Sequence, residues 1–101
     1  MNTIYDKPGS ELYSAKHSLK PVNFYCDAPG ANQVKIAGDF NHWFPVPMQR
    51  RVDGWWYVQM LLNHGHHQYR FVVDGVPRLD PQAMGTTRNE EEGEVSVVAV
   101  S

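Results

Sequence analysis

Apolar and polar residues alternate with a period of two along most of the chain after residue 20. The alternation is seen first over residues 22–26 and again over 34–36. Because successive side chains of a β-strand point to opposite faces of its sheet, both segments are predicted to be strands with one buried face. Between them, the run Asp27-Ala28-Pro29-Gly30 is typical of a turn.

Two segments in the middle of the chain, residues 55–62 and 68–73, show the same alternation. The residues predicted to point inward are Trp56, Val58, Met60, Leu62, Tyr69, Phe71 and Val73. The residues predicted to point outward are Trp55, Tyr57, Gln59, Gln68, Arg70 and Val72. A turn predicted at Asn63-His64-Gly65-His66 joins the two segments, so that they form a hairpin.

The rest of the chain completes a β-rich domain. A short strand is predicted over residues 76–79, a long polar loop over 81–93 and a final strand over 95–100. No segment has the periodicity of an amphipathic helix. About seven short strands separated by Gly, Pro, Asn and Asp predict an all-β fold, with two sheets in a sandwich.

Residues 1–20 do not follow this pattern. They mix charged residues with Pro8, Gly9 and two tyrosines without a sustained period, with room for a short helical turn over 11–17. The predicted organisation is therefore an N-terminal arm over residues 1–20 and a single β-sandwich domain over 21–101.

The composition supports an independent globular domain and argues against several kinds of partner. The chain has 101 residues, 42% of them hydrophobic and 12% aromatic, which is enough to close a core without metal or disulfide. The formal net charge is -2 and the basic residues are scattered apart from Arg50-Arg51, which argues against binding to nucleic acid or anionic membrane. Cys26 is the single cysteine, and residues 1–10 contain no apolar run that could serve as a signal peptide, so a cytoplasmic location is expected.

Trp43 stands in a sequence setting that suits sugar binding. It follows Asn41 and His42 in a polar turn and precedes Phe44-Pro45, which should stiffen the loop. An indole face matches the flat C–H face of a sugar ring, and amide or charged neighbours can bond its hydroxyls. The alternative is that Trp43 folds back and caps the end of the sandwich.

Other outward positions also carry candidate binding groups. Arg70 offers planar donors to sugar hydroxyls, although an outward arginine can equally pair with a carboxylate. Trp55 and Tyr57 are candidates for a second aromatic surface, for a sugar or for a protein partner, unless the N-terminal arm covers them.

Residue identity becomes informative in the run VKIAGDFNHW at residues 34–43. Together with Gly54-Trp55-Trp56, the run from Gly65 to Gly75 and Asp80-Pro81, it resembles the isoamylase early-set domains and the related glycogen-binding domain of the AMP-activated protein kinase beta subunit. The resemblance covers the chain from about Pro21 to its end and implies an immunoglobulin-like β-sandwich of the early-set type. Some members bind starch or glycogen, others are accessory domains of branching and debranching enzymes, and this chain resembles the small stand-alone bacterial members.

The resemblance also implies a sugar site. The family holds sugar with two tryptophans, a lysine, a loop leucine and nearby Thr and Asn side chains. The first tryptophan falls on Trp43 and the lysine on Arg70, but the second tryptophan falls on Pro77, which removes one stacking surface. In the loop, Met84-Gly85-Thr86 matches the family's Leu-Gly-Thr, whereas a gap-free count from Asp80-Pro81 places Glu91 at the leucine. The candidate carbohydrate-binding residues are Trp43, Asn41, Arg70, Met84, Thr86 and Asn89.

The sequence contains no arrangement typical of an enzyme or a metal site. His64, His66 and His67 surround a tight turn, where successive side chains diverge instead of converging on a metal. Asp74 lies in a turn and, with Asp80, would need a cleft to act as a glycosidase carboxylate pair. We therefore expect no catalytic residues, no cofactor and no metal.

The sequence thus predicts a non-catalytic module that binds α-glucans of the glycogen or starch type. The alternative is an early-set scaffold that has lost sugar binding and acts as a protein-interaction or regulatory domain, as Pro77 and the acidic run Glu90-Glu91-Glu92 suggest. The expected partner is a glucan in the first case and a protein, such as a glucan-metabolising enzyme, in the second.

Overall fold

The computed structural model describes residues 19–101. The arm predicted over residues 1–20, with its helical turn, lies outside the described residues except for its last two positions. Within residues 19–101, no helix is long and apolar enough to cross a bilayer.

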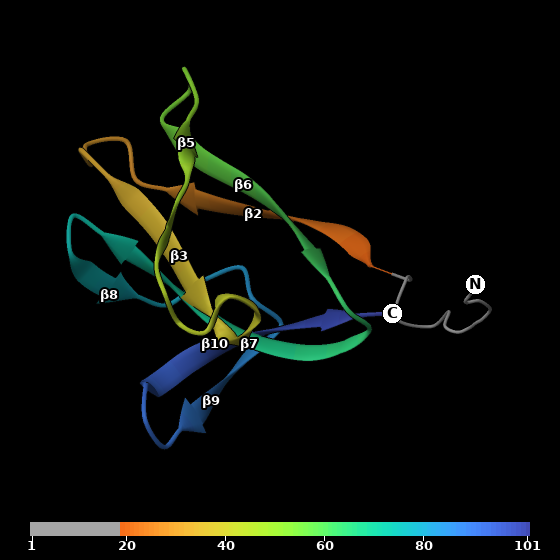
Figure 1. The fold of residues 1–101 in the computed structure, drawn as a ribbon. Helices are drawn as coiled ribbons and strands as arrows, with labels where there is room; N and C mark the ends of the chain where they lie inside the picture. Colours follow the sequence, from red (N-terminus) through yellow and green to blue (C-terminus); the bar gives the residue numbers. More distant parts are fainter. Residues whose placement is uncertain (1–18) are drawn as a thin grey trace, which may run out of the picture.

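Nine antiparallel strands form most of the described residues. They are β2 (Lys20–Asp27), β3 (Val34–Gly38), β4 (Val46–Pro47), β5 (Gln49–Arg50), β6 (Trp55–Leu62), β7 (Gly65–Val73), β8 (Val76–Arg78), β9 (Gly85–Asn89) and β10 (Gly93–Val100). One sheet has the order β4-β3-β7-β10-β9, with β8 also paired to β7, and the other has the order β2-β6-β5. The two sheets form the predicted all-β, immunoglobulin-like sandwich (Figure 1).

The structure has nine strands in residues 19–101, a few more than the sequence pattern predicts. Two of the additional strands, β4 and β5, are two residues long and stand on either side of Met48. Met48 is buried, and its N–H donates to the carbonyl of Val34 (2.8 Å) where the chain passes from one sheet to the other. Pairings this short leave no alternating pattern in the sequence.

The long polar loop predicted over residues 81–93 is wrong in part, because β9 lies inside it. β9 pairs with β10 from Gly85 opposite Val97 to Asn89 opposite Gly93. It is the last strand of its sheet, and its side chains are exposed or half-buried. An edge strand without a buried face does not need apolar residues, so its threonines and arginine gave it the composition of a loop.

The inward faces predicted from the alternation are confirmed. Trp56, Leu62, Tyr69 and Phe71 are buried, and Val58, Met60 and Val73 pack against them. Phe24 of one sheet and Tyr69 of the other pack edge to face, with ring centroids 4.8 Å apart. The indole N–H of Trp56 donates to the carbonyl of Ala28 (2.9 Å), which satisfies its polar atom inside the core.

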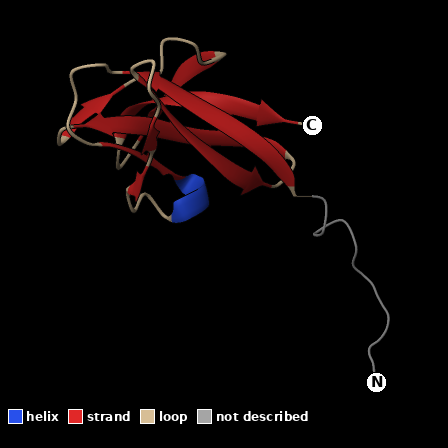
Figure 2. Cartoon of the chain, turned by 90° about the horizontal axis from the view of Figure 1, so that it is seen from above, coloured by secondary structure: helices blue, strands red, loops and turns tan. Residues whose placement is uncertain are grey.

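A short helical turn, η3 (Asp39–Asn41), follows β3 and begins the loop that carries Trp43 (Figure 2). His42 and Trp43 then have positive φ values of 57° and 61°, and the chain reverses to pair as β4 with β3. The carbonyl of Gly38 accepts the N–H of Trp43 (2.8 Å) at the base of this reversal. A Cβ added at Gly38 would lie 2.6 Å from the Phe40 ring.

Gly38→Ala should therefore lower the free energy of unfolding by about 1–3 kcal/mol, since the added methyl group overlaps both Phe40 and the backbone oxygen of Gln68. Urea denaturation measures the change. Gly85→Ala is the matched control, because a Cβ there meets nothing within 4 Å, and it should alter stability by about 0.5 kcal/mol or less. Equal stability of the two variants would contradict this account of the loop.

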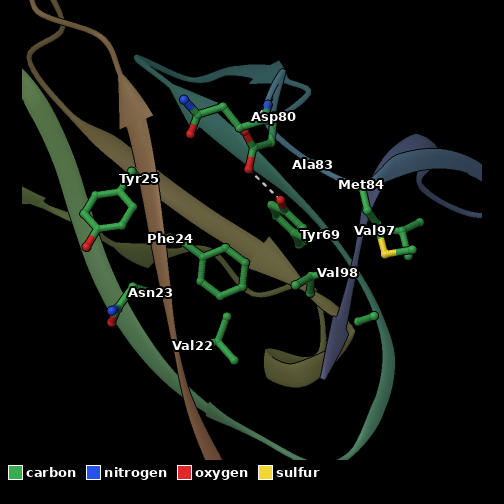
Figure 3. A pocket seen from close by; sticks show the side chains of 12 residues that line it. Val22, Asn23, Phe24, Tyr25, Tyr69, Asp80, Ala83, Met84, Val97 and Val98 are labelled. Carbon is green, nitrogen blue, oxygen red and sulfur yellow. Dashed lines mark hydrogen bonds between the residues drawn. The ribbon is translucent and has the colours of Figure 1, made fainter. Parts of the chain in front are cut away.

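Tyr69 links the core to the segment after β8. Its hydroxyl donates to Oδ2 of Asp80 (2.5 Å; Figure 3), and burial together with this hydrogen bond raises the pKa of Tyr69 well above its usual range. Because the folded-state pKa exceeds the unfolded one, the linked stabilisation is complete below about pH 10 and is lost as the pH rises through the folded-state pKa.

Tyr69→Phe should accordingly lower the free energy of unfolding by about 1–3 kcal/mol at neutral pH, because it removes a hydrogen bond to a charged group. The difference between wild type and variant should shrink above about pH 10, where the unfolded tyrosine ionises. Denaturation curves at several pH values test this. Parallel pH profiles for the two proteins would show that the hydroxyl is not linked to stability in this way.

Candidate functional site

The outer face of the six-stranded sheet brings Trp43 and Arg70 together. Arg70 lies on β7 between the inward residues Tyr69 and Phe71, so its side chain points away from the core. The loop after β3 folds back over the same face, and the Arg70 Cζ lies 5.4 Å from the centroid of the Trp43 ring. This is a cation–π contact between two of the predicted site residues.

Arg70 also pairs with a carboxylate, which is the alternative that the sequence left open. Its Nη2 donates to Oε1 of Glu92 (2.8 Å) and its Nη1 donates to the Glu92 carbonyl (3.2 Å). Its Nε is buried and has no hydrogen-bond partner among the described residues. Arg70 is therefore held by Trp43 and Glu92 at once, with one donor left unsatisfied.

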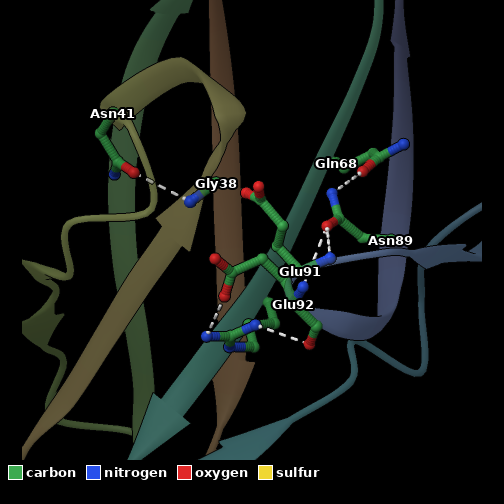
Figure 4. Close-up of polar contacts among 7 residues, drawn as sticks. Gly38, Asn41, Gln68, Asn89, Glu91 and Glu92 are labelled. Atoms are coloured by element: carbon green, nitrogen blue, oxygen red, sulfur yellow. Dashed lines mark hydrogen bonds and ion pairs between the residues drawn. The ribbon is translucent and has the colours of Figure 1, made fainter.

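Asn89 shapes the turn that brings Glu92 to this face. Its Oδ1 accepts the N–H groups of Glu91 (2.8 Å) and Glu92 (2.9 Å), and its Nδ2 donates to Oε1 of Gln68 (2.8 Å) on β7 (Figure 4). Gly93 completes the turn with a φ of 82°. The turn over residues 89–93 is thus fixed against the outer face of β7, and Asn89 acts through Glu92 and Gln68.

Asn41 holds the Trp43 loop. Its Oδ1 accepts the N–H of Gly38 (2.8 Å; Figure 4), and its Nδ2 donates to the carbonyl of Ile36 (3.3 Å). Both ends of the amide are engaged with backbone. The structure therefore places Asn41 beside the site as a positioning residue for Trp43.

The outer face of the sheet beneath Trp43 and Arg70 contains residues that solvent cannot reach. Ala37 points to the same face as Arg70, which stands opposite it across the β3–β7 pair, and it is completely buried. Val95 on β10 is also completely buried, although neither residue belongs to the main core cluster. Side chains therefore cover the middle of this outer face, and Trp43 is half-buried.

The position of the second tryptophan lacks an aromatic ring. Pro77 lies on β8 opposite Val72 of β7, on the face that carries Arg70, and it is exposed. Phe44, beside Trp43 in the loop, is an aromatic residue that the sequence reasoning did not single out as a candidate. It is 77% exposed, and its place between Trp43 and Pro45 was the available signal.

Met84 and Thr86 are not brought to Trp43 and Arg70. Met84 lines a hollow with Phe24 and Tyr69, on the inner side of β7. Thr86 stands opposite the buried Ser96, and its hydroxyl bonds the side chain of Glu94 (3.3 Å). The turn at Glu91 and Glu92 lies against Arg70 instead, as the gap-free count from Asp80-Pro81 would place it.

Glu92 and Gln68 are polar groups of this face that the sequence reasoning missed. Glu92 belongs to an acidic triplet that resembles a solvated loop, and only the pairing of β9 with β10 turns it toward Arg70. Gln68 was predicted to point outward, but nothing in the sequence places it beside Asn89, which is 21 residues away.

Trp55 and Tyr57 belong to a different surface. They lie on β6, where they pair with Asp27 and Tyr25 of β2, on the face opposite the buried Trp56. Both are half-buried, and the Tyr57 ring lies 5.4 Å from that of Tyr25. They are thus an aromatic surface on the three-stranded sheet, separate from Trp43 on the six-stranded one.

The two aspartates considered for catalysis, and His67 of the three histidines considered for a metal, make contacts within the domain. Asp74 accepts backbone N–H groups of residues 32 and 33 at 2.9–3.3 Å, and Asp80 accepts a tyrosine hydroxyl. His67 Nδ1 lies 3.1 Å from Oδ1 of Asp39. In the described part of the chain no group of three His, Cys, Asp or Glu side chains is placed to hold a metal. Burial raises the pKa of the Cys26 thiol, which keeps it protonated.

Comparisons with known proteins identify the domain. Residues 20–101 match the family model described as the glycogen recognition site of AMP-activated protein kinase. The chain is 36% identical over 67 residues to the 5'-AMP-activated protein kinase subunit beta-1 of Sus scrofa, covering 59% of this chain and 53% of that one. It is 33% identical over 75 residues to the 1,4-alpha-glucan branching enzyme GlgB of Deinococcus radiodurans, covering 67% of this chain and 11% of the enzyme.

The chain spans about half of the Sus scrofa sequence, about a quarter of the beta-1 subunit of Homo sapiens and about a tenth of the branching enzyme. The match to the family model, by contrast, runs from the start of β2 to the last residue. The chain therefore belongs to the family of glycogen recognition domains of AMP-activated protein kinase.

Proposed function

We propose that the chain is a non-catalytic module that binds α-glucans of the glycogen or starch type through the face formed by Trp43 and Arg70. The observation that carries the proposal is the contact of the Arg70 guanidinium with the Trp43 ring, at 5.4 Å, in a domain of the glycogen recognition family. The cytoplasmic location expected from the sequence stays a prediction.

The two side chains supply the two kinds of contact that a sugar needs. Trp43 is half-buried, so part of its ring remains accessible to the C–H face of a pyranose. Arg70 offers planar donors to hydroxyls, and Gln68 and Glu92 bring acceptors to the border of the same face. Asn41 and Asn89 support this arrangement by fixing the two loops that meet there.

The affinity should be weak, because one of the family's two stacking positions is a proline. Pro77 presents no ring at that position, and Phe44 is the exposed aromatic side chain nearest to Trp43 in the chain. We expect a dissociation constant of about 0.1 mM or above, which corresponds to a binding free energy of about −5.5 kcal/mol or weaker.

A second candidate function, a protein-interaction domain without sugar binding, is favoured by one contact. Glu92 engages two donors of Arg70 that a sugar would otherwise use. One relative is by name a subunit of AMP-activated protein kinase, and a protein partner for this chain is proposed on that similarity. If the wild-type domain does not bind sugar, the protein-interaction function is the candidate that remains.

Trp43→Ala should abolish binding of maltoheptaose at this face, because it removes the ring against which the sugar stacks. Stability should fall by only about 1 kcal/mol, since the indole is half-buried and its ring contact is with a partly exposed arginine. An NMR titration that follows the backbone amide signals of Gln68 and Arg70 measures binding at this face, and a thermal melt measures stability. Leu61→Ala, which changes an exposed side chain on the other sheet, should bind as wild type. Wild-type affinity in Trp43→Ala would reject the site.

Arg70→Lys separates the structural role of the arginine from its role in binding. Lysine keeps the charge and can donate to a hydroxyl, but it cannot reproduce the paired contact with Glu92. We expect sugar affinity within about threefold of wild type and a loss of stability of about 1–3 kcal/mol, because the two side chains of the ion pair are only 19% and 23% exposed. Arg70→Ala should lose both sugar affinity and stability. If Arg70→Lys binds as poorly as Arg70→Ala, the guanidinium itself is required.

A further inference from the structure

A groove runs along the side of the sandwich where the end of β2 faces residues 78–82. Its largest part is a hollow of about 360 Å³ that Tyr25 and Trp55 line together with Arg78 and Gln82. A smaller hollow of about 210 Å³ shares Tyr25, Trp55 and Gln82 with it. A third, of about 300 Å³, shares Tyr25 and Gln82 and reaches toward Met84 (Figure 3). Tyr25 and Gln82 line all three hollows, which therefore adjoin one another, and together they are called the groove below.

The residues of this groove combine ring surfaces with hydrogen-bonding groups. Tyr25 is exposed and Trp55 half-buried, and core residues Cys26 and Phe71 contribute to the lining of the largest hollow. Gln82 is exposed, and its side-chain amide can both donate and accept. A mostly apolar concavity of a few hundred Å³ with a few polar groups at its border is typical of a small-molecule site.

The charges that line the groove nearly cancel, since two arginines, Arg51 and Arg78, stand against three aspartates, Asp27, Asp53 and Asp80. Arg51 lies 2.7 Å from the carboxylate of Asp53, and its guanidinium lies over the Tyr25 ring. Arg78 donates to the carbonyl of Asp27 (3.1 Å), and the carboxylate of Asp80 accepts the Tyr69 hydroxyl. A charged ligand of either sign therefore also meets groups of its own sign here, so the groove favours a neutral ligand with an apolar face and hydroxyl groups.

We infer that the groove beside Trp55 is a second sugar site, which binds a pyranose ring of an α-glucan between Trp55, Tyr25 and Gln82. The identity of the ligand rests on the proposed function, whereas the location rests on this groove alone. Trp55 lies on the outer face of the three-stranded sheet and Trp43 on the outer face of the other sheet. The two sites are independent, and a polysaccharide that engages both gains affinity through effective concentration.

An NMR titration of the full, isotope-labelled chain with maltoheptaose tests the inference. The indole N–H signals of Trp43, Trp55 and Trp56 report separately, and Trp56 is the internal control because its N–H is bonded to Ala28 inside the core. Saturable shifts of the Trp55 signal should appear in wild type and persist in Trp43→Ala with a dissociation constant changed by less than about twofold, as expected for independent sites.

Variants of the groove make the test specific. Gln82→Ala, which alters an exposed side chain, should weaken the Trp55 response several-fold and leave the Trp43 response unchanged. Leu61→Ala is the matched control, because Leu61 is 62% exposed on the same face of β6 as Trp55 but does not line these hollows. It should leave the responses of Trp43 and Trp55 unchanged.

The outcomes separate this inference from the proposed function. Trp43 shifts without Trp55 shifts would overturn the second site and leave the proposed site at Trp43. Trp55 shifts without Trp43 shifts would reject the site at Trp43 and leave the second site. Trp55 shifts that disappear in Trp43→Ala would reduce the two sites to one and overturn the inference. A response of Trp55 to extended peptides but not to sugar would assign the groove to a protein partner and overturn it as well.

Discussion

β7 carries the centre of the core and the centre of the candidate site on its two faces. Tyr69 and Phe71 point inward and are buried, whereas Gln68 and Arg70 point outward, because side chains alternate along a strand. β7 is also hydrogen-bonded to three other strands, β3, β8 and β10. A shift of one residue in its register would bury Arg70 and expose Phe71. The core therefore fixes Arg70 on the outer face as firmly as it fixes its own residues.

The backbone conformation of the loop fixes the position of Trp43, and contacts of the indole ring do not. A bulky residue with a φ of 61° costs roughly 1–2 kcal/mol relative to ordinary conformations. The loop compensates with the bond from Trp43 N–H to the Gly38 carbonyl and with the two bonds made by the Asn41 amide. These contacts leave the indole side chain out of the scaffold, so its ring contact with Arg70 can change while the loop keeps its shape. Asn41 and Gly38 therefore maintain the shape of the loop, whereas Trp43 provides the surface that a ligand can contact.

Features that follow from the alternation of apolar residues or from residue identity could be predicted from the sequence. Features that depend on the pairing of particular strands were missed. The buried faces of β6 and β7 followed from alternation, and the shared position of Trp43 and Arg70 followed from the family resemblance. β9 was missed because a polar edge strand has no buried face to mark it. Without β9 there was no reason to turn Glu92 toward Arg70 or to move Met84 to the other side of β7. Each of these errors therefore comes from one undetected hairpin, β9–β10.

The contact between Arg70 and Glu92 does not by itself decide between a structural and a binding role. A guanidinium has five N–H donors, and Glu92 engages two of them, one through its carboxylate and one through its carbonyl. The two side chains of this ion pair are only 19% and 23% exposed, so the pair contributes about 1–3 kcal/mol, more than an exposed pair would. A sugar hydroxyl is therefore expected to use a remaining donor of Arg70 and to leave the contact with Glu92 in place. The ion pair holds the guanidinium in place over Trp43, and this orientation reduces the entropy that sugar binding would otherwise lose.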